Sequence, residues 1–159
     1  MAQDAEALPL ADLVRELSNE IMQVQRWAAE QSGLNYTDLM GLYFIRNGEG
    51  TVTPTQLAQH LGLTSGATTI LLNRLDARGF VVRSPHPTDR RGVLLSLGPA
   101  AVADGFLNVR DRLYSLNASV FDAMAPEEAV IVRRFLGELL TNTRDALRDL
   151  RTGKSSPAP

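Results

Sequence analysis

The residues from 53 to 97 place a helical pattern directly before a strand pattern, and this order restricts the fold more than any other feature. Thr53 before Pro54 is typical of a helix start, because the hydroxyl caps free N–H groups and proline in the first turn loses no hydrogen bond. A short apolar face follows, with Leu57 and Leu61 at its ends. Gly62 is expected to end this helix.

A second helix is predicted after a tight turn, with Thr64 or Ser65 as its cap and Gly79 as its stop. One face of this helix is expected to pack inward, because its residues recur at steps of three and four. The opposite face is mostly small and polar. The inward residues are Thr68, Leu71, Leu72 and Leu75, and the outward residues are Gly66, Thr69, Ile70 and Asn73.

Two short segments rich in β-branched and aliphatic residues come next and predict a hairpin. The first is FVVRS at 80–84, and the second is VLLSL at 93–97. The basic segment HPTDRRG joins them and is too long for a two-residue turn. We therefore expect a two-stranded wing with an extended basic loop.

Amphipathic helices are predicted on both sides of this region. On the N-terminal side, a helix over 37–47 is expected to begin with Thr37 as its cap. On the C-terminal side, a final helix is expected to begin at Pro126 with two glutamates in its first turn. A heptad seam after Gly98 predicts one long helix packed along another. The first stripe is Leu10, Leu13, Leu17, Ile21, Val24 and Ala28; the seam is Val102, Phe106, Val109, Leu113, Leu116, Val120 and Ala123; the last stripe includes Phe135, Leu136, Leu139, Leu140, Leu147 and Leu150.

This order of elements is that of a winged helix-turn-helix. The predicted fold is mainly α with a small β-hairpin wing and long terminal dimerisation helices. The terminal helices carry more apolar surface than one small winged domain can cover, which favours a homodimer. We expect a helical dimerisation region at 1–33 and 98–150, a winged DNA-binding region at 34–97 and a disordered tail at 151–159.

The residue composition argues against several classes of protein. The chain has 159 residues, no cysteine and two histidines, so thiolate metal sites and thiol chemistry are excluded and no metal or cofactor is expected. No glycine-rich phosphate loop or nucleophile elbow is present, which argues against an enzyme. No apolar run approaches the length of a membrane helix, and the acidic start MAQDAEALPLADLV lacks a signal-peptide pattern, so a cytoplasmic protein is expected.

The basic residues are concentrated in the middle of the chain. Residues 51–100 carry a net charge of +3, whereas residues 1–50 carry −5 and residues 101–159 are neutral. The positive block contains Arg74, Arg78, Arg83, Arg90 and Arg91. A basic centre between acidic or neutral flanks indicates a local anion-binding surface even though the whole chain is slightly acidic.

The stretch from about Leu34 to Leu97 resembles the MarR family of bacterial transcription regulators. The matching pieces are TPTQLAQHLGL, TSGATTILLNRLDARGFVVR and HPTDRRGVLLSL. The most specific element is the run Asp89-Arg90-Arg91-Gly92 after a proline-bearing turn. The flanking helices match the family in pattern and length only.

The resemblance implies an obligate homodimer whose two winged units straddle double-stranded, pseudo-palindromic DNA. It predicts a repressor released by a small aromatic or phenolic ligand, with half-sites about one helical turn apart. The expected dimer interface consists of Leu10, Leu13, Leu17, Leu113, Leu116, Phe135, Leu139 and Leu147.

The expected DNA contacts lie on the second helix of the motif and on the wing. By resemblance, Arg91 enters the minor groove, oriented by Asp89, and Arg90 contacts phosphate. Ile70 stands where the family usually has a polar or basic residue, and either touches a thymine methyl or packs against the wing. Arg74 either contacts DNA or braces the wing through a carboxylate. The full set is Thr64, Ser65, Ala67, Thr69, Ile70, Asn73, Arg74, Arg83, His86, Asp89, Arg90 and Arg91.

Several aromatic residues are candidates for a ligand cleft, because members of the family bind small molecules between the dimer helices and the winged unit. These candidates are Trp27, Tyr36, Met40 and Tyr43, each with ordinary core packing as the alternative. Two other functions stay open: a winged-helix protein-interaction module without DNA binding, and a small-molecule-binding protein without regulation.

Overall fold

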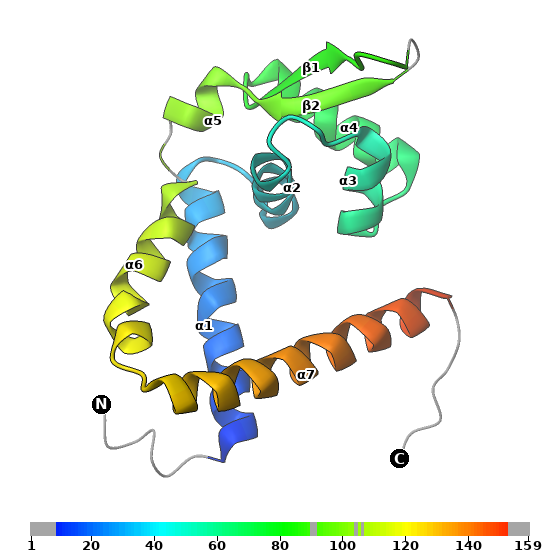
Figure 1. Ribbon diagram of the computed structural model, residues 1–159. Coiled ribbons are helices and arrows are strands. Elements are labelled where there is room, and N and C mark those ends of the chain that lie inside the picture. Colours follow the sequence, from blue (N-terminus) through cyan, green and yellow to red (C-terminus); the bar gives the residue numbers. More distant parts are fainter. Residues whose placement is uncertain (1–8, 90–91, 104, 106, 153–159) are drawn as a thin grey trace. The chain divides into compact units, whose positions relative to one another are not determined.

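The computed structural model describes residues 9–89, 92–103, 105 and 107–152. In chain order the elements are α1 (Leu10–Gln31), α2 (Tyr36–Asn47), α3 (Pro54–Leu61), α4 (Ser65–Ala77), β1 (Val81–Pro85), β2 (Val93–Leu97), α5 (Pro99–Ala103), α6 (Asn108–Asp122) and α7 (Pro126–Thr152) (Figure 1). The fold is mainly helical with one hairpin, which confirms the predicted winged helix-turn-helix. The chain divides into two compact units, residues 1–113 and 114–159.

The turns around α3 follow from local chemistry. Thr53 and Gln56 form a capping box: the Thr53 hydroxyl oxygen accepts from the Gln56 N–H at 3.3 Å, and the Gln56 side-chain oxygen accepts from the Thr53 N–H at 2.8 Å. Gly62 ends α3 with a φ of 68°, a left-handed conformation that glycine adopts without strain. The Thr64 side chain caps α4, so α3 and α4 are separated by a tight turn.

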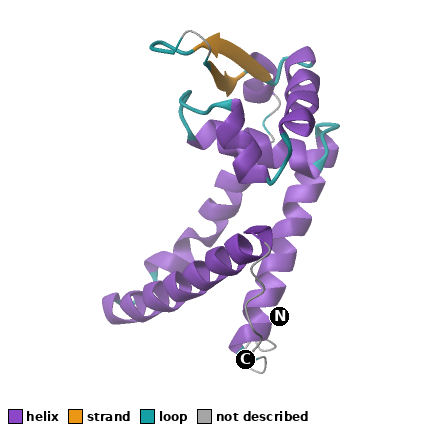
Figure 2. Cartoon of the chain, turned by 90° about the vertical axis from the view of Figure 1, so that its right-hand side faces the viewer, coloured by secondary structure: helices purple, strands orange, loops and turns teal. Residues whose placement is uncertain are grey.

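The hairpin is antiparallel, with Val81 opposite Leu97 and Pro85 opposite Val93 (Figure 2). Val52 adds an isolated bridge to Leu95, and its carbonyl accepts from the Leu95 N–H at 2.8 Å. The hairpin starts directly after α4, because Gly79 takes a positive φ and Gly98 lies against its carbonyl. A Cβ on Gly98 would come within 2.2 Å of that oxygen. The wing is therefore tied closely to the end of α4.

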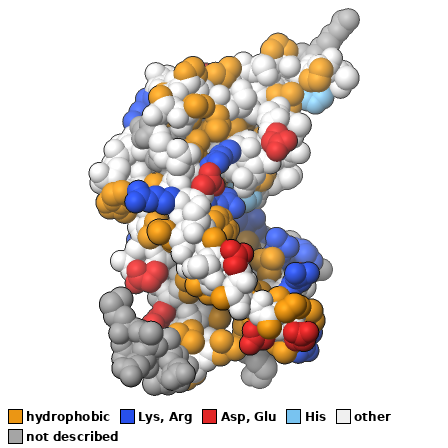
Figure 3. All heavy atoms as spheres, turned by 60° about the vertical axis from the view of Figure 1, so that its left-hand side comes forward, with side chains coloured by type: hydrophobic (Ala, Val, Ile, Leu, Met, Phe, Trp, Pro, Cys, Tyr) orange, Lys and Arg blue, Asp and Glu red, His pale blue; other side chains and the backbone are white. Residues whose placement is uncertain are grey.

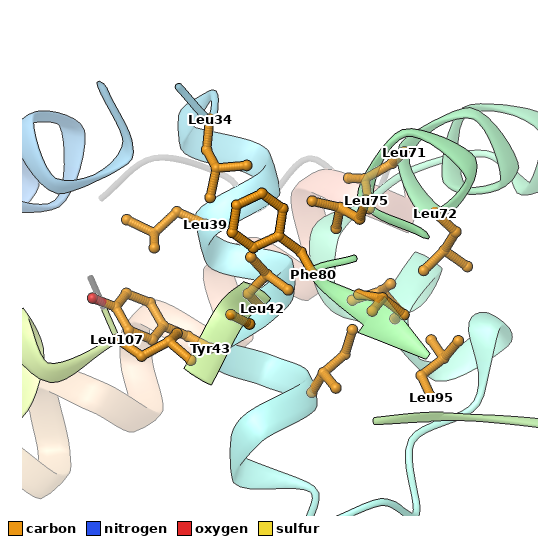
Figure 4. Packing of buried hydrophobic residues seen from close by; sticks show 14 of the residues in the cluster. Leu34, Leu39, Leu42, Tyr43, Leu71, Leu72, Leu75, Phe80, Leu95 and Leu107 are labelled. Atoms are coloured by element: carbon orange, nitrogen blue, oxygen red, sulfur yellow. The ribbon is translucent and has the colours of Figure 1, made fainter. Parts of the chain in front are cut away.

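The core of the first unit lies between α2, α3, α4 and the hairpin (Figure 4). The inward face predicted for α4 is confirmed, since Thr68 and its three leucines are buried. Other fully buried residues come from α2, α3 and β2, namely Leu39, Leu42, Ile45, Leu57 and Leu95. This packing fixes α4 by its inner face and leaves its outer face exposed.

Two sequence predictions about the flanking helices are wrong. The cap of α2 is Asn35, whose side chain accepts from the Asp38 N–H at 2.8 Å, and Thr37 already lies within the helix. The seam that starts at Val102 does not follow one long helix, because α5 ends at Ala103 and α6 begins at Asn108. Gly105, between them, has a φ of 76° that a helix cannot accommodate. Phe106 lies outside the described residues.

Candidate nucleic-acid interface

The outer face of α4 is the central part of the candidate interface. Ser65, Gly66, Thr69, Ile70 and Asn73 are all exposed, and Ala67 is partly buried. Thr64 and Thr69 are engaged locally: the Thr64 hydroxyl accepts from the Ala67 N–H at 3.2 Å, and the Thr69 hydroxyl donates to the Ser65 carbonyl at 2.9 Å. A helix face of small and polar side chains has the shape and chemistry that the major groove admits.

Arg74 leaves this face and holds α4 against α2. Its guanidinium donates to both oxygens of the Asp38 carboxylate, at 3.0 Å and 2.5 Å. Asp38 is only 2% exposed, and the hydrogen bond from Arg74 satisfies its charge there. The same bond raises the pKa of the Arg74 guanidinium above its usual value. Of the alternatives for Arg74, the carboxylate brace is present, but it joins α4 to α2 and not to the wing.

Arg83 on β1 joins the wing to α4. Its guanidinium donates to the side-chain oxygen of Asn73 at 2.6 Å and lies 3.5 Å from an Asp76 carboxylate oxygen. The ion pair and hydrogen bond fix the first wing strand beside the outer face of α4.

Arg78 at the end of α4 reaches back to the turn between α1 and α2. It donates to the Ser32 carbonyl at 2.8 Å and to the Gly33 carbonyl at 2.7 Å, and it lies 4.8 Å above the ring of Phe80. All three arginines of the basic block that the structure describes therefore contact protein acceptors.

The wing loop is anchored at its base. The His86 N–H donates to the Gly92 carbonyl at 3.0 Å, and the ring Nδ1 of His86 accepts from the N–H groups of Thr88 and Asp89. Asp89 is exposed at the start of the basic tip. Arg90 and Arg91, which carry the strongest sequence signal, lie outside the described residues. Among the residues that the structure does describe, none form a His, Asp and Glu cluster suited to a metal ion.

The four ligand candidates occupy different environments. Trp27 is 55% exposed on α1, and the Tyr36 hydroxyl donates to the Gln25 side-chain oxygen of the same helix at 3.2 Å. Met40 is partly buried and packs against the core, and Tyr43 belongs to that core at 5% exposure (Figure 4). A separate hollow of about 520 Å³ in the second unit is lined by Val120, Ala123, Met124, Glu128, Ile131 and Val132. None of the four candidates lines it.

Burial raises the pKa of the Tyr43 phenol, and the Arg110 and Arg46 guanidinium groups offset part of that rise. Folded Tyr43 therefore keeps its proton at pH values where a tyrosine of the unfolded chain loses it. Because the folded state then binds more protons, the free energy of unfolding falls as pH rises above about 10, by at most ~1.4 kcal/mol per pH unit.

We expect Tyr43→Phe to remove this alkaline loss. The difference in unfolding free energy between wild type and variant should decline from about pH 8 to about pH 10.5, because only the wild type titrates at this position. Urea unfolding at both pH values measures it. A difference that stays constant across the interval would contradict the assignment.

The residues expected at the dimer interface lie on α1, α6 and α7. Leu10, Leu17, Leu116 and Leu147 are exposed, whereas Leu13, Leu113, Phe135 and Leu139 are partly buried. Further large apolar side chains are exposed on the same helices, and hydrophobic side chains are visible at the surface in Figure 3. The exposed set on α6 and α7 includes Tyr114, Val120, Phe121, Val130, Ile131, Leu136, Leu140 and Leu150. No helix in the described ranges is long and apolar enough to span a bilayer.

The sequence did not predict the residues that form hydrogen bonds and ion pairs behind the candidate interface. Asp38 sits in the first turn of α2, where an acidic residue is ordinary, so nothing in the sequence marked it as buried. Arg46 on α2 donates to the Leu107 carbonyl at 2.7 Å and pairs with Asp111 on α6. Spacing gave no signal for either ion pair, because Arg74 and Asp38 are 36 positions apart and Arg46 and Asp111 are 65 positions apart.

Comparisons with known proteins agree with this geometry. The model of the MarR family matches residues 32–92. An uncharacterised HTH-type transcriptional regulator of Bacillus subtilis, YcgE, is 28% identical over 87% of this chain and 89% of its own length. The multiple antibiotic resistance protein MarR of Salmonella typhimurium is 43% identical over 34% of this chain and 38% of its own. The crystal structure of Streptococcus pneumoniae FabT in complex with DNA has a TM-score of 0.62 at 23% identity, covering 89% of this chain and 96% of that one.

Proposed function

Because the chain belongs to the MarR family of transcription regulators, we propose that it binds double-stranded DNA as a homodimer and represses transcription until a small ligand releases it. The observation that carries the proposal is the exposed polar face of α4 beside a hairpin that is joined to it through Arg83 and Asn73. In this arrangement α4 enters the major groove, and the basic tip of the wing reaches the neighbouring backbone or minor groove.

The contacts on the inner side of α4 support a fixed orientation of its outer face. Arg74 holds α4 to α2 and Arg78 holds its end to the α1–α2 turn, so the outer face of α4 keeps one orientation. A preset orientation favours sequence reading, because the side chains need not be ordered when DNA binds. The DNA-bound FabT structure has the same fold, which supports a nucleic-acid partner for this chain.

Dimerisation is supported by the large apolar side chains that α1, α6 and α7 each expose, because exposed apolar surface of this kind marks protein–protein interaction sites. The terminal segments 1–33 and 98–150 are the proposed dimerisation region, and 34–97 is the proposed DNA-binding region. Two-fold symmetry then requires two half-sites about one helical turn apart. A ligand releases DNA only if it binds the dimer more tightly in a conformation whose two winged units do not match the half-site spacing than in the DNA-binding conformation. Trp27 and Tyr36 remain the proposed ligand contacts.

The test is binding of the purified protein to DNA from upstream of its own gene and to a random duplex, at two salt concentrations. We expect preferential binding that weakens at least about tenfold between roughly 50 and 200 mM salt, because phosphate contacts release counterions. Arg91→Ala should weaken binding about tenfold and reduce the salt slope by about one, with the dimer intact.

Arg15→Ala is the matched control, since Arg15 is exposed on α1 and pairs with Asp12 in the same helix. This variant should bind DNA as the wild type does. Wild-type affinity in Arg91→Ala would remove the proposed role of the wing tip. Binding to neither duplex at low salt would favour the alternative, a winged-helix module that binds another protein.

A further inference from the structure

The outer face of α4, within the described residues from Ser65 to Asn73, carries one large apolar side chain, Ile70. It is 65% exposed, so the rest of the chain leaves most of it uncovered. An exposed isoleucine on a face of otherwise small and polar residues gains free energy only from an apolar partner outside the chain. In the major groove, the apolar group that base edges offer is the 5-methyl of thymine.

Asn73, one helical turn further along the same face, has a fixed amide orientation. The Arg83 guanidinium lies 2.6 Å from its side-chain oxygen. A guanidinium has donors and no acceptor, so the amide atom facing Arg83 must be the oxygen. The amide nitrogen is turned away from Arg83, and among the described residues it has no protein acceptor. Asn73 therefore presents the N–H donors of its amide to the outside, and the amide oxygen is occupied by Arg83.

The two side chains are neighbours, because residues three apart on a helix have Cβ atoms about 5–6 Å from each other. Together they offer an apolar group beside a donor. Thymine carries the complementary pair on its major-groove edge, a methyl at C5 beside an acceptor at O4. Cytosine has a donor in place of O4, guanine has acceptors without a methyl, and adenine also lacks the methyl.

We propose that Ile70 and Asn73 read one thymine in each half-site, with the Ile70 side chain on the 5-methyl and the Asn73 amide donating to O4. Arg83 acts as a positioning residue, since its bond to the Asn73 oxygen selects the donor side of the amide. This inference rests on the proposed function, because it requires α4 to lie in the major groove.

The experiment begins with duplexes that wild-type protein selects from a random-sequence pool. Each thymine of the selected half-site is then replaced singly. Deoxyuridine lacks the methyl and keeps the adenine partner, whereas 5-methylcytosine, paired with guanine in place of adenine, keeps the methyl and replaces O4 with an amino donor. At one thymine we expect deoxyuridine to weaken binding about fourfold and 5-methylcytosine about tenfold. The two losses must fall at the same thymine.

Variants assign each loss to its residue. Ile70→Ala should bind the thymine and deoxyuridine duplexes equally, because no side chain remains to contact the methyl. Asn73→Ala should lose discrimination against 5-methylcytosine and keep the deoxyuridine effect. Arg83→Ala should also lose discrimination against 5-methylcytosine, because the freed amide can turn its oxygen to the amino group. A purely structural Arg83 would lower affinity for all duplexes by the same factor.

Val102→Ala is the control. Val102 is an exposed apolar side chain on α5 and not on the outer face of α4, so any effect of this variant on the proposed dimer scales all affinities alike and leaves every ratio between duplexes unchanged. Thermal unfolding checks that each variant is folded. We expect the Ile70 and Asn73 variants to fold, because both side chains are exposed. Failure to select any sequence overturns the proposed function and this inference together. A selected site whose thymines tolerate both replacements, or an Ile70→Ala variant that still senses the methyl, overturns the inference alone.

Discussion

Arg74→Met is expected to lower the free energy of unfolding by about 3 kcal/mol. The substitution keeps much of the side-chain volume and removes the charge that Asp38 faces. Asp38 is almost entirely buried and receives both of its hydrogen bonds to side chains from Arg74. A buried carboxylate left without its partner bears an uncompensated desolvation cost, which is larger than the net value of the pair.

Urea unfolding at one fixed protein concentration measures this loss, because the stability of the proposed dimer would depend on concentration. Arg148→Ala is the matched control. Arg148 pairs with Asp145 on the exposed surface of α7, and such a pair contributes only about 0–1 kcal/mol. The double variant Asp38→Leu with Arg74→Met should recover most of the loss, because no buried charge remains. A single variant as stable as Arg148→Ala would contradict the brace between α2 and α4.

Leu116→Glu is expected to weaken the proposed dimer at least about a hundredfold, because each subunit would then place a carboxylate in the proposed apolar interface. Leu116 suits this test because it is 70% exposed in the single chain, so the substitution leaves the subunit folded. Leu113 occupies the same stripe of α6 but is partly buried within one chain, and a glutamate there would disturb the subunit itself. Sedimentation equilibrium over a range of concentrations gives the dissociation constant.

Ser115→Glu introduces the same charge into α6 about 100° away around the helix axis. Its neighbours one turn away include Asp111, Arg112 and Ser119, so it lies on the polar side of α6 and the variant should remain dimeric. Equal dissociation constants for Leu116→Glu and wild type would remove α6 from the proposed interface. Equal weakening by both variants would point to a general effect of charge.

The winged region was predictable because its signals are local. The Thr53–Pro54 start, the stops at Gly62 and Gly79 and the period of the α4 leucines depend on residues within one or two turns. These signals depend on helix caps, on glycine backbone conformation and on which side of a helix is apolar. All three can be predicted from the types and spacing of nearby residues. The outer face of α4 followed from the same period, since the residues opposite a buried stripe are exposed.

The partners of the arginines were not predictable from spacing. Arg74 pairs with Asp38 across 36 positions of sequence, and Arg78 bonds to backbone carbonyls that carry no side-chain signature. The helix break at Gly105 was hidden for a related reason. The apolar residues on its two sides keep a heptad spacing, so periodicity alone continued the helix through a glycine whose backbone leaves the helical region.

The contacts of Arg78 have a consequence for how the protein opens. The turn after α1 is secured by a side chain from the end of α4, and the two carbonyls it holds belong to residues that link α1 to α2. The last turn of α1 therefore cannot fray without releasing the end of α4, and the two helix ends belong to one cooperative unfolding unit. Transient opening of this chain thus involves the end of α4 and the last turn of α1 together, so the proposed DNA-binding face of α4 is preserved or lost with the end of α1.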